Sequence, residues 1–348
     1  MHPISAFFDS IGNCLTGSFL QDGALWALQN IPGFPPVIQT VHILGIAVIM
    51  GSIVLLNLRI LKLAVPSQSL SEIARRVMPF FWFALASNLV SGAFFVFARP
   101  MRYFNNPVFL WKMAALLPIV ILTFLYHQLS KREPDFWQLN PSRILVSRLI
   151  AFLSLTAVLL VCTGGRWIAY TEYLDYPLWY IEPYFDGTEF PFWVSVENWA
   201  ISQIIAATNW FPTLETIHVI AASLLVGSIL WVDLRLIGIA ATAYPVSVLN
   251  RELIPWAWGA FTLATITGLG MFITRASGHF QNPAFQTKAI LLTLAGANMA
   301  YFHFALNRNR EQWNGETEPP RQAKTAGLMS LILWALVMLA GRWVGHIV

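Results

Sequence analysis

The feature that most constrains this sequence is an internal repeat whose two copies align without a gap. Residues 40–61 read TVHILGIAVIMGSIVLLNLRIL, and residues 216–237 read TIHVIAASLLVGSILWVDLRLI. His42 therefore aligns with His218, and the difference 218 − 42 gives an offset of 176 residues. The same offset holds from residue 36 to residue 172. Chance would not align Arg, Lys, His and Pro over that length, so we interpret the chain as two tandem copies of one unit.

Charged residues, prolines and glycines recur at this offset, which separates matched positions from incidental ones. The further matched pairs are Gly51–Gly227, Arg59–Arg235, Pro79–Pro255, Gly92–Gly268, Arg99–Arg275, Lys112–Lys288, His127–His303 and Arg166–Arg342. The copies differ at Asn57 against Asp233, Tyr103 against His279, Tyr126 against Phe302, and Tyr170 against His346. If the copies have diverged in function, we expect these four positions to show it.

Each copy contains four apolar segments of about 20 residues, the length that spans a bilayer. The segments are 37–58, 78–98, 108–128, 145–165, 213–234, 254–274, 284–304 and 325–345. Only 11% of the residues are charged, against about 25% in soluble domains. We therefore expect most of the protein surface to contact lipid rather than water. We predict an all-α polytopic membrane protein with eight transmembrane helices, arranged as two tandem four-helix bundles. Copies with four spans each share one orientation, which predicts a pseudo-twofold axis along the membrane normal.

The distribution of Lys and Arg predicts the topology. Most of the 21 Lys and Arg residues lie in loops after the first, third, fifth and seventh spans, and such an excess marks the cytoplasmic side. Both termini are therefore predicted on the periplasmic side of a bacterial inner (cytoplasmic) membrane, with no signal peptide, because no Lys or Arg precedes Arg59. The net charge of +4 is modest and argues against nucleic acid as a partner. Cys14 and Cys162 are expected to be free thiols rather than a disulfide.

Four regions follow from these patterns. They are an outer amphipathic N-terminal segment at 1–35, a first four-helix unit at 36–172, a periplasmic aromatic and acidic connector at 173–211, and a second four-helix unit at 212–348. The connector carries the stretches PLWYIEPYF and FPFWVSVENW. These favour a folded lid on the membrane surface over an unstructured linker.

Ionisable residues inside the spans are functional candidates, since charge in lipid is costly. His42 lies roughly 9 Å and Lys112 roughly 7–8 Å from the outer end of its span, at a rise of 1.5 Å per residue. Arg99 and Arg166 end the second and fourth spans on the same side. Each copy is thus predicted to gather one His, one Lys and two Arg at an outer level, the second copy through His218, Lys288, Arg275 and Arg342. The economical explanation is a bound anion.

His127 and His303 form a separate inner level, because each lies about 20 Å deeper than the outer histidines. Asp233 lies beside this level in the second copy and could orient His303 through its second ring nitrogen. The sequence therefore offers two histidine levels in each half.

A cofactor that uses both imidazole and cations is haem b. Helical bundles hold haem iron through His, and the propionates need Arg or Lys. The candidate iron ligands are His42, His218, His127 and His303, and the candidate cations are Lys112, Lys288, Arg99, Arg275, Arg166 and Arg342. Two simpler readings stand beside this one. A membrane His can merely bond a neighbouring helix, and the Arg–Trp pairs at residues 166 and 342 can anchor span ends at the interface or bind a quinone carbonyl.

The same residues carry a family resemblance. His42 with Leu58-Arg59, followed by Trp111-Lys112 and Tyr126-His127, resembles the bacterial haem-containing membrane protoporphyrinogen oxidase type. The unit is also similar to the membrane domain of copper resistance protein D. The set T-x-H, D-L-R-L, N-P, Lys and G-R-W resembles a bacterial membrane family of unknown function, here duplicated over 36–172 and 212–348.

The resemblance implies site roles. In the oxidase type the first-span His ligates haem and the third-span Lys is essential, so these roles would fall on His42, His218, Lys112 and Lys288. The oxidase is a single unit, whereas this chain is a fused pair.

These patterns favour a b-type cytochrome-like protein that transfers electrons between quinone and a periplasmic redox protein, with membrane oxidoreductase activity as one form of that role. The alternative function is a transporter for a small anion or a metal without haem. A third reading is a membrane subunit with structural work only. The sequence leaves open the number of haems, the redox partner and whether the protein forms a homo-oligomer.

Overall fold

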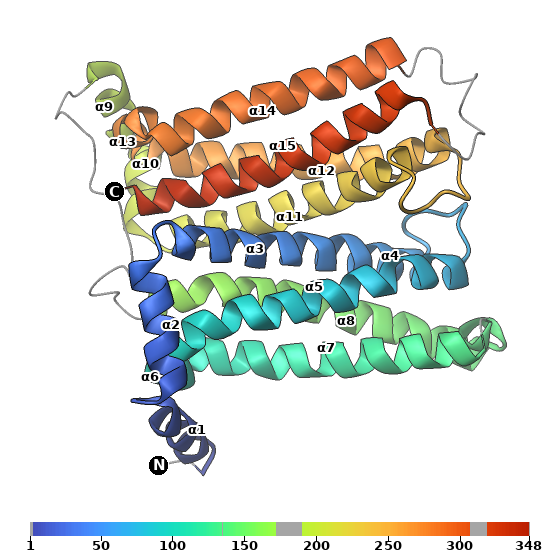
Figure 1. The fold of residues 1–348 in the computed structure, drawn as a ribbon, viewed down its shortest axis with the longest axis horizontal. Helices are drawn as coiled ribbons and strands as arrows, with labels where there is room; N and C mark the ends of the chain where they lie inside the picture. Colours follow the sequence, from blue (N-terminus) through green and yellow to red (C-terminus); the bar gives the residue numbers. More distant parts are fainter. Residues whose placement is uncertain (1–2, 134, 172–189, 307–318, 348) are drawn as a thin grey trace.

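The computed structural model describes residues 3–133, 135–171, 190–306 and 319–347, and within these ranges the chain forms helices and no β-strand. Figure 1 shows the long helices lying side by side, with both chain termini at one end of the bundle. We call this end the terminal end, and the opposite end the far end.

Among the described residues, seven helical segments are long and apolar enough to cross a membrane. They comprise Phe34–Ile60 (α3, η1 and α4), α5 (Leu70–Ala98), α7 (Pro107–Arg132), α8 (Pro141–Thr171), α11 (Trp210–Leu236), α12 (Val246–Ile273) and Arg321–His346 (α15 and η5). The membrane character predicted from composition is therefore confirmed.

The eighth predicted span, 284–304, forms α14 (Pro283–Tyr301) and the start of a π-helix, η3 (Phe302–Leu306). This helix lies beside α15 (Arg321–Trp343) like the other spans (Figure 1). Gln286, Lys288 and Asn298 make it more polar than its neighbours. Its passage through the membrane stays a prediction.

Each copy is built from two helical hairpins. In the first copy α3 (Phe34–Ile49) packs on α5 and α7 packs on α8, and in the second copy α11 packs on α12 and α14 packs on α15. The fourth span of each copy also contacts the first span of the other, because α8 packs on α11 and α15 packs on α3. The two copies are therefore interlocked rather than merely adjacent.

The first spans of the two copies cross at a pair of glycines. A methyl group on Gly51 would lie 2.6 Å from the Gly227 carbonyl oxygen, and one on Gly227 would lie 2.7 Å from the Ala47 carbonyl oxygen. Gly51 belongs to a π-helical turn, η1 (Met50–Val54), whose backbone is continued by α4 (Leu55–Ile60). The buried Trp231 indole donates to the Gly51 carbonyl at 2.8 Å. Backbones this close require glycine at the contact.

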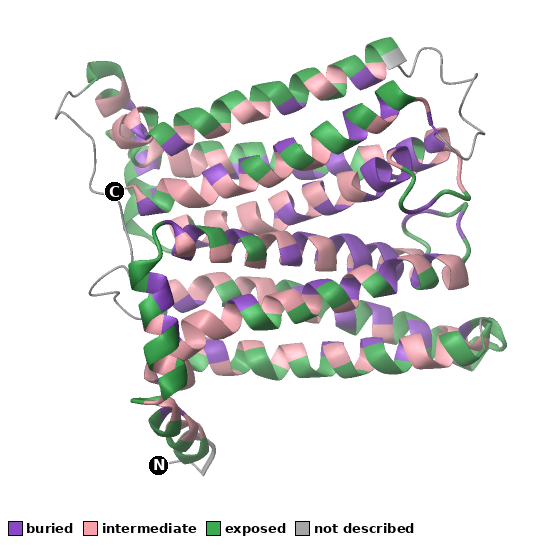
Figure 2. Cartoon of the chain, viewed as in Figure 1, coloured by how far each residue is buried: buried purple, intermediate pink, exposed green. Residues whose placement is uncertain are grey.

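Figure 2 shows exposed stretches along α7 and α14, and large apolar side chains are exposed on several of the long helices. Phe83, Phe152, Ile266 and Ile290 each expose more than 60% of their surface. Exposed apolar side chains on this scale fit contact with lipid rather than water.

Arg59 and Arg235 at the far end have structural roles. The Arg59 Nε donates to the Gln68 carbonyl at 2.6 Å, and the Arg235 Nε donates to the Tyr244 carbonyl at 2.7 Å. Both bonds fasten the loop that follows a first span, and the partners are again 176 residues apart (244 − 68).

Short helices cover the terminal end. They are α1 (Pro3–Leu15), α2 (Phe19–Asn30), α6 (Pro100–Phe104), α9 (Pro191–Glu197), α10 (Ala200–Ala207) and α13 (Ala276–Gln281). α9 contains most of the FPFWVSVENW stretch and packs on α13, where Glu197 accepts a hydrogen bond from the Ser277 amide at 2.7 Å. The described part of the connector is thus folded against the second copy, while PLWYIEPYF lies outside the described residues.

The remaining short elements are η2 (Phe136–Gln138) between α7 and α8, and η5 (Val344–His346) after α15. Cys14 in α1 and Cys162 in α8 are free thiols, as expected.

Candidate functional site

His42 is fixed by a hydrogen-bond acceptor on α5. Its Nδ1 lies 2.9 Å from the Ser91 hydroxyl oxygen. The Ser91 hydroxyl uses its own proton on the Ser87 carbonyl at 2.8 Å, so it can only accept from the imidazole. Nδ1 therefore carries the proton, and Nε2 keeps the lone pair.

His218 repeats this arrangement in the second copy. Its Nδ1 lies 2.8 Å from the Ala264 carbonyl and 3.2 Å from the Thr267 hydroxyl, which in turn donates to Leu263 at 2.8 Å. A carbonyl can only accept, so His218 takes the same tautomer as His42. The structure gives neither Nε2 atom a hydrogen-bond partner among the residues it describes. Two unprotonated Nε2 atoms, each oriented through Nδ1, are what metal-binding imidazoles require.

Each imidazole lies against a glycine of the second span. A methyl group on Gly92 would lie 3.3 Å from His42 Cε1, and one on Gly268 would lie 3.1 Å from His218 Cε1. Both rings are thus held inside their own copy, on α5 and α12 respectively. The repeat matched these two glycines without indicating that they contact the histidines.

The structure brings the third-span lysine of each copy to its histidine. The charge of Lys112 acts on His42, and that of Lys288 acts on His218. Neither lysine forms an ion pair within the described residues. In both copies the third-span lysine thus lies within electrostatic range of the first-span histidine.

Glycines of the fourth span lie next to the two ammonium groups. A methyl group on Gly165 would lie 3.5 Å from the Lys112 Nζ, and one on Gly341 would lie 3.6 Å from the Lys288 Nζ. All four long helices of a copy thus contribute to its site.

The N-P pairs explain how the lysines are positioned. The Asn106 side chain caps α7 by accepting from the Val108 amide at 2.9 Å and donates to the Thr171 hydroxyl at 2.6 Å. Asn282 caps α14 in the same way through the Ala284 amide at 2.9 Å and donates to the Ile347 carbonyl at 3.0 Å. Each asparagine thus starts the third span two turns before its lysine and ties it to the end of the fourth.

The contacts described for Arg166 and Arg342 go to the other copy, not to the His–Lys site of their own copy. Arg166 forms an ion pair with Glu215 of the second copy, and Tyr170 donates a hydrogen bond to the same carboxylate. Arg342 instead donates to Gln39 of the first copy. The sequence reading missed Gln39 and Glu215, although the offset aligns them (215 − 39 gives 176).

Arg99 and Arg275 lie at the ends of α5 and α12, outside the His–Lys pairs. Arg99 is half-buried near Tyr103, where burial raises the pKa of the phenol against the opposing effect of Arg102 and Arg99. Arg275 is exposed. Burial lowers the pKa of His279 on α13, and its ring stacks on Phe272 with centroids 5.9 Å apart.

The inner histidines are placed differently from the outer ones. His127 lies in regular α-helix, whereas His303 lies in the π-helix η3. The buried Asp233 carboxyl lies near Ser330 of α15, and its Oδ2 has no hydrogen-bond partner among the described residues. The orientation of His303 by Asp233 stays a prediction.

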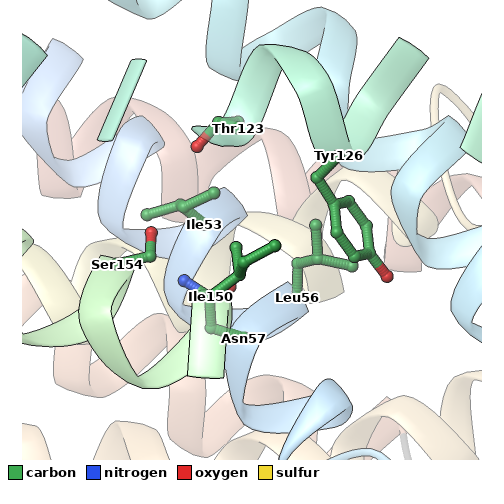
Figure 3. Close-up of a pocket in the computed structure, with 7 residues that line it drawn as sticks. All are labelled: Ile53, Leu56, Asn57, Thr123, Tyr126, Ile150 and Ser154. Carbon is green, nitrogen blue, oxygen red and sulfur yellow. The ribbon is translucent and has the colours of Figure 1, made fainter. Parts of the chain in front are cut away.

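The first copy has a small cavity of about 10 Å³ at this inner level. Its walls come from η1, α4, α7 and α8 (Figure 3). The polar lining residues are Asn57, Thr123, Tyr126 and Ser154. Such a volume holds at most one water molecule.

Across the described residues, no three His, Cys, Asp or Glu side chains converge on one point as a metal-holding group.

Comparison with known proteins identifies a family without assigning a function. Residues 33–171 and residues 205–347 each match the model of a family described as a family of unknown function, DUF6644. No curated protein matches the chain. The repeated match agrees with the internal repeat found in the sequence. Because the two stretches span more than half of the chain, it belongs to the DUF6644 family as a tandem duplicate.

Proposed function

We propose that this protein is a membrane b-type cytochrome-like electron carrier in which His42 and His218 each ligate one haem b. One observation carries the proposal. In both copies the imidazole keeps its proton on Nδ1, bonded to the second span, and presents an unprotonated Nε2. The repeated tautomer leaves the same nitrogen of each imidazole available to a metal.

The other residues of each site fit such a group. Haem needs a flat approach, and Gly92 and Gly268 lie against the two imidazoles where any Cβ would be in close contact. Its carboxylates need cations, and Lys112 and Lys288 lie near the histidines without an ion-pair partner among the described residues. When bound, the group would supply one-electron exchange at its iron. The chain would orient the ligand nitrogen and neutralise the carboxylates.

The environment suggests the route of electrons. The helices α9 and α10 of the connector lie at the terminal end (Figure 1), and α3 and α11, which carry His42 and His218 near their starts, begin at that end. With the predicted orientation in a bacterial inner membrane, this end faces the periplasm. A periplasmic redox protein would dock there, and quinone would reach the sites from the lipid. His127 and His303 would then be candidate ligands for a second level.

The test is optical. We expect purified protein from haem-replete cells to show a reduced-minus-oxidised Soret band and α-band, with two haems per chain in a pyridine haemochrome assay. His42→Ala and His218→Ala should each remove about half of the haem, and the double variant should remove nearly all of it.

His279→Tyr is the matched control, because the first copy carries tyrosine at that position, and it should keep full haem content. His127→Ala and His303→Ala decide whether the inner level binds haem. A colourless, correctly folded wild-type preparation would rule out the proposal.

A second candidate function is a transporter for a small anion without haem. It is favoured by the lysines that lack an ion-pair partner in the described part of the chain. It predicts anion flux into liposomes that depends on Lys112 and Lys288, measured with protein that contains no haem.

A further inference from the structure

The two copies meet at the terminal end through two polar clusters of the same design. The first cluster comprises Arg166, Tyr170 and Glu215, and the second comprises Arg342, His346 and Gln39. Every member of one cluster is 176 positions from a member of the other. Each cluster joins the fourth span of one copy to the first span of the other.

The charges of the first cluster balance. The Arg166 guanidinium pairs with the Glu215 carboxylate, and the Tyr170 hydroxyl donates to that carboxylate. One positive and one negative charge lie together, which is the arrangement that makes charge tolerable away from water.

The second cluster has the same shape without the negative charge. The Gln39 amide oxygen accepts both from the Arg342 Nε and from His346 Nε2, the latter at 3.1 Å. The charge of Arg342 also lies within range of Arg166 and of the single carboxylate of Glu215. Over the described residues, Arg342 has no ion pair of its own, so the interface holds two guanidinium groups and one carboxylate.

An uncompensated guanidinium near the ends of membrane helices favours an anion as its partner. The Gln39 oxygen is occupied by two donors, which leaves its NH2 group and the Arg342 Nη groups to donate elsewhere. A planar guanidinium beside an amide NH2 suits the two oxygens of a carboxylate or a phosphate group.

We propose that Arg342, Gln39 and His346 form a binding site, between the two copies, for one carboxylate or phosphate group. The bound oxygens take the place that Glu215 fills in the first cluster. The site does not depend on haem, and the ligand is either a soluble anion or an anionic lipid headgroup.

The test uses full-length protein in nanodiscs of phosphatidylcholine, with the thermal midpoint followed by tryptophan fluorescence. Inorganic phosphate and benzoate probe the soluble source, and added phosphatidylglycerol probes the lipid source. Wild type should gain stability saturably with at least one of them. Arg342→Gln should weaken the response about tenfold or more, because a charge-assisted hydrogen bond is lost.

Exchanging the two first-span residues sharpens the test. Gln39→Glu should raise the midpoint without anion and abolish the response, since the chain then supplies its own carboxylate. Glu215→Gln should lower the midpoint and enlarge the response, because it creates a second site. Arg102→Gln removes a cation at the same end that has no repeat partner and should leave the response unchanged.

Two results would overturn the site: no response of wild type to any of the three anions, or a response that survives both Arg342→Gln and Gln39→Glu. Haem content measured on the same samples separates this inference from the proposed function. Loss of the anion response with full haem, or loss of haem in His42→Ala with a normal anion response, shows the two to be independent.

Discussion

The two copies agree at the His–Lys level and differ at the inner level. In both copies the imidazole Nδ1 bonds matched residues of the second span, and matched glycines lie against the imidazole and the lysine. At the inner level the first copy has Asn57 and Ser154 at a small cavity, where the Asn57 Nδ2 and the Ser154 hydroxyl find no partner within the described structure. The second copy has Asp233 beside Ser330 at the matched positions, and the Asp233 Oδ2 also finds no partner among the described residues. The outer level is thus the more alike of the two, and under the proposed function it is the site that both copies share.

The two copies pack against each other where their first spans cross at Gly51 and Gly227. We expect substitutions of these glycines to have the largest effect on stability. Gly51→Ala and Gly227→Ala each force backbone atoms apart, and we expect a loss of about 3 kcal/mol or more of unfolding free energy. Denaturant unfolding in mild detergent measures it. Gly259→Ala is the control, since a methyl group there meets nothing within 4 Å, and it should be neutral or stabilising. Equal effects of all three variants would contradict the close crossing.

Exchanging the inner polar residues gives the next effect. Asn57→Asp puts a carboxyl at a cavity too small to solvate it, and we expect a loss of about 2 kcal/mol in stability. Asp233→Asn keeps an oxygen for Ser330 and should change stability by less than about 1 kcal/mol. Thermal and denaturant unfolding of both variants, with haem content as a second readout, would check this. Similar losses for the two variants would mean that the inner levels are equivalent after all.

The smallest effect concerns His279, which stands where the first copy has Tyr103. Burial lowers the pKa of His279 below its ordinary value of 6.5 in the folded protein. Because the unfolded chain then binds the proton more readily, stability should fall as the pH drops below about 6.5. His279→Tyr should remove this part of the pH dependence of the thermal midpoint. Tyr103→His should add a similar dependence to the first copy, and unchanged pH profiles in both variants would argue against it.

The sequence predicted the helical class, the repeat and the His–Lys level, because these depend on hydropathy, on register and on a fixed rise per residue. It did not predict the tautomers of His42 and His218, since these depend on the backbone carbonyls of Ser87, which takes the Ser91 proton, and of Ala264, and a carbonyl carries no side-chain signal. Gln39 and Glu215 were detectable from the offset alone. The sequence could not predict that the fourth span of each copy contacts the first span of the other copy. Contacts between helices of different copies are decided by three-dimensional packing.

These contacts between the copies have a consequence for how such a chain could arise. The fourth span of each unit binds the first span of the other through Arg166 with Glu215 and Arg342 with Gln39. A solitary unit would therefore leave its fourth-span arginine without its first-span partner. Severing the connector between residues 172 and 189 should therefore yield halves that assemble as an obligate pair. A single-unit ancestor would have been a homodimer with two identical clusters. Fusion into one chain freed the clusters to differ, so that one could close with Glu215 while the other stayed open with Gln39.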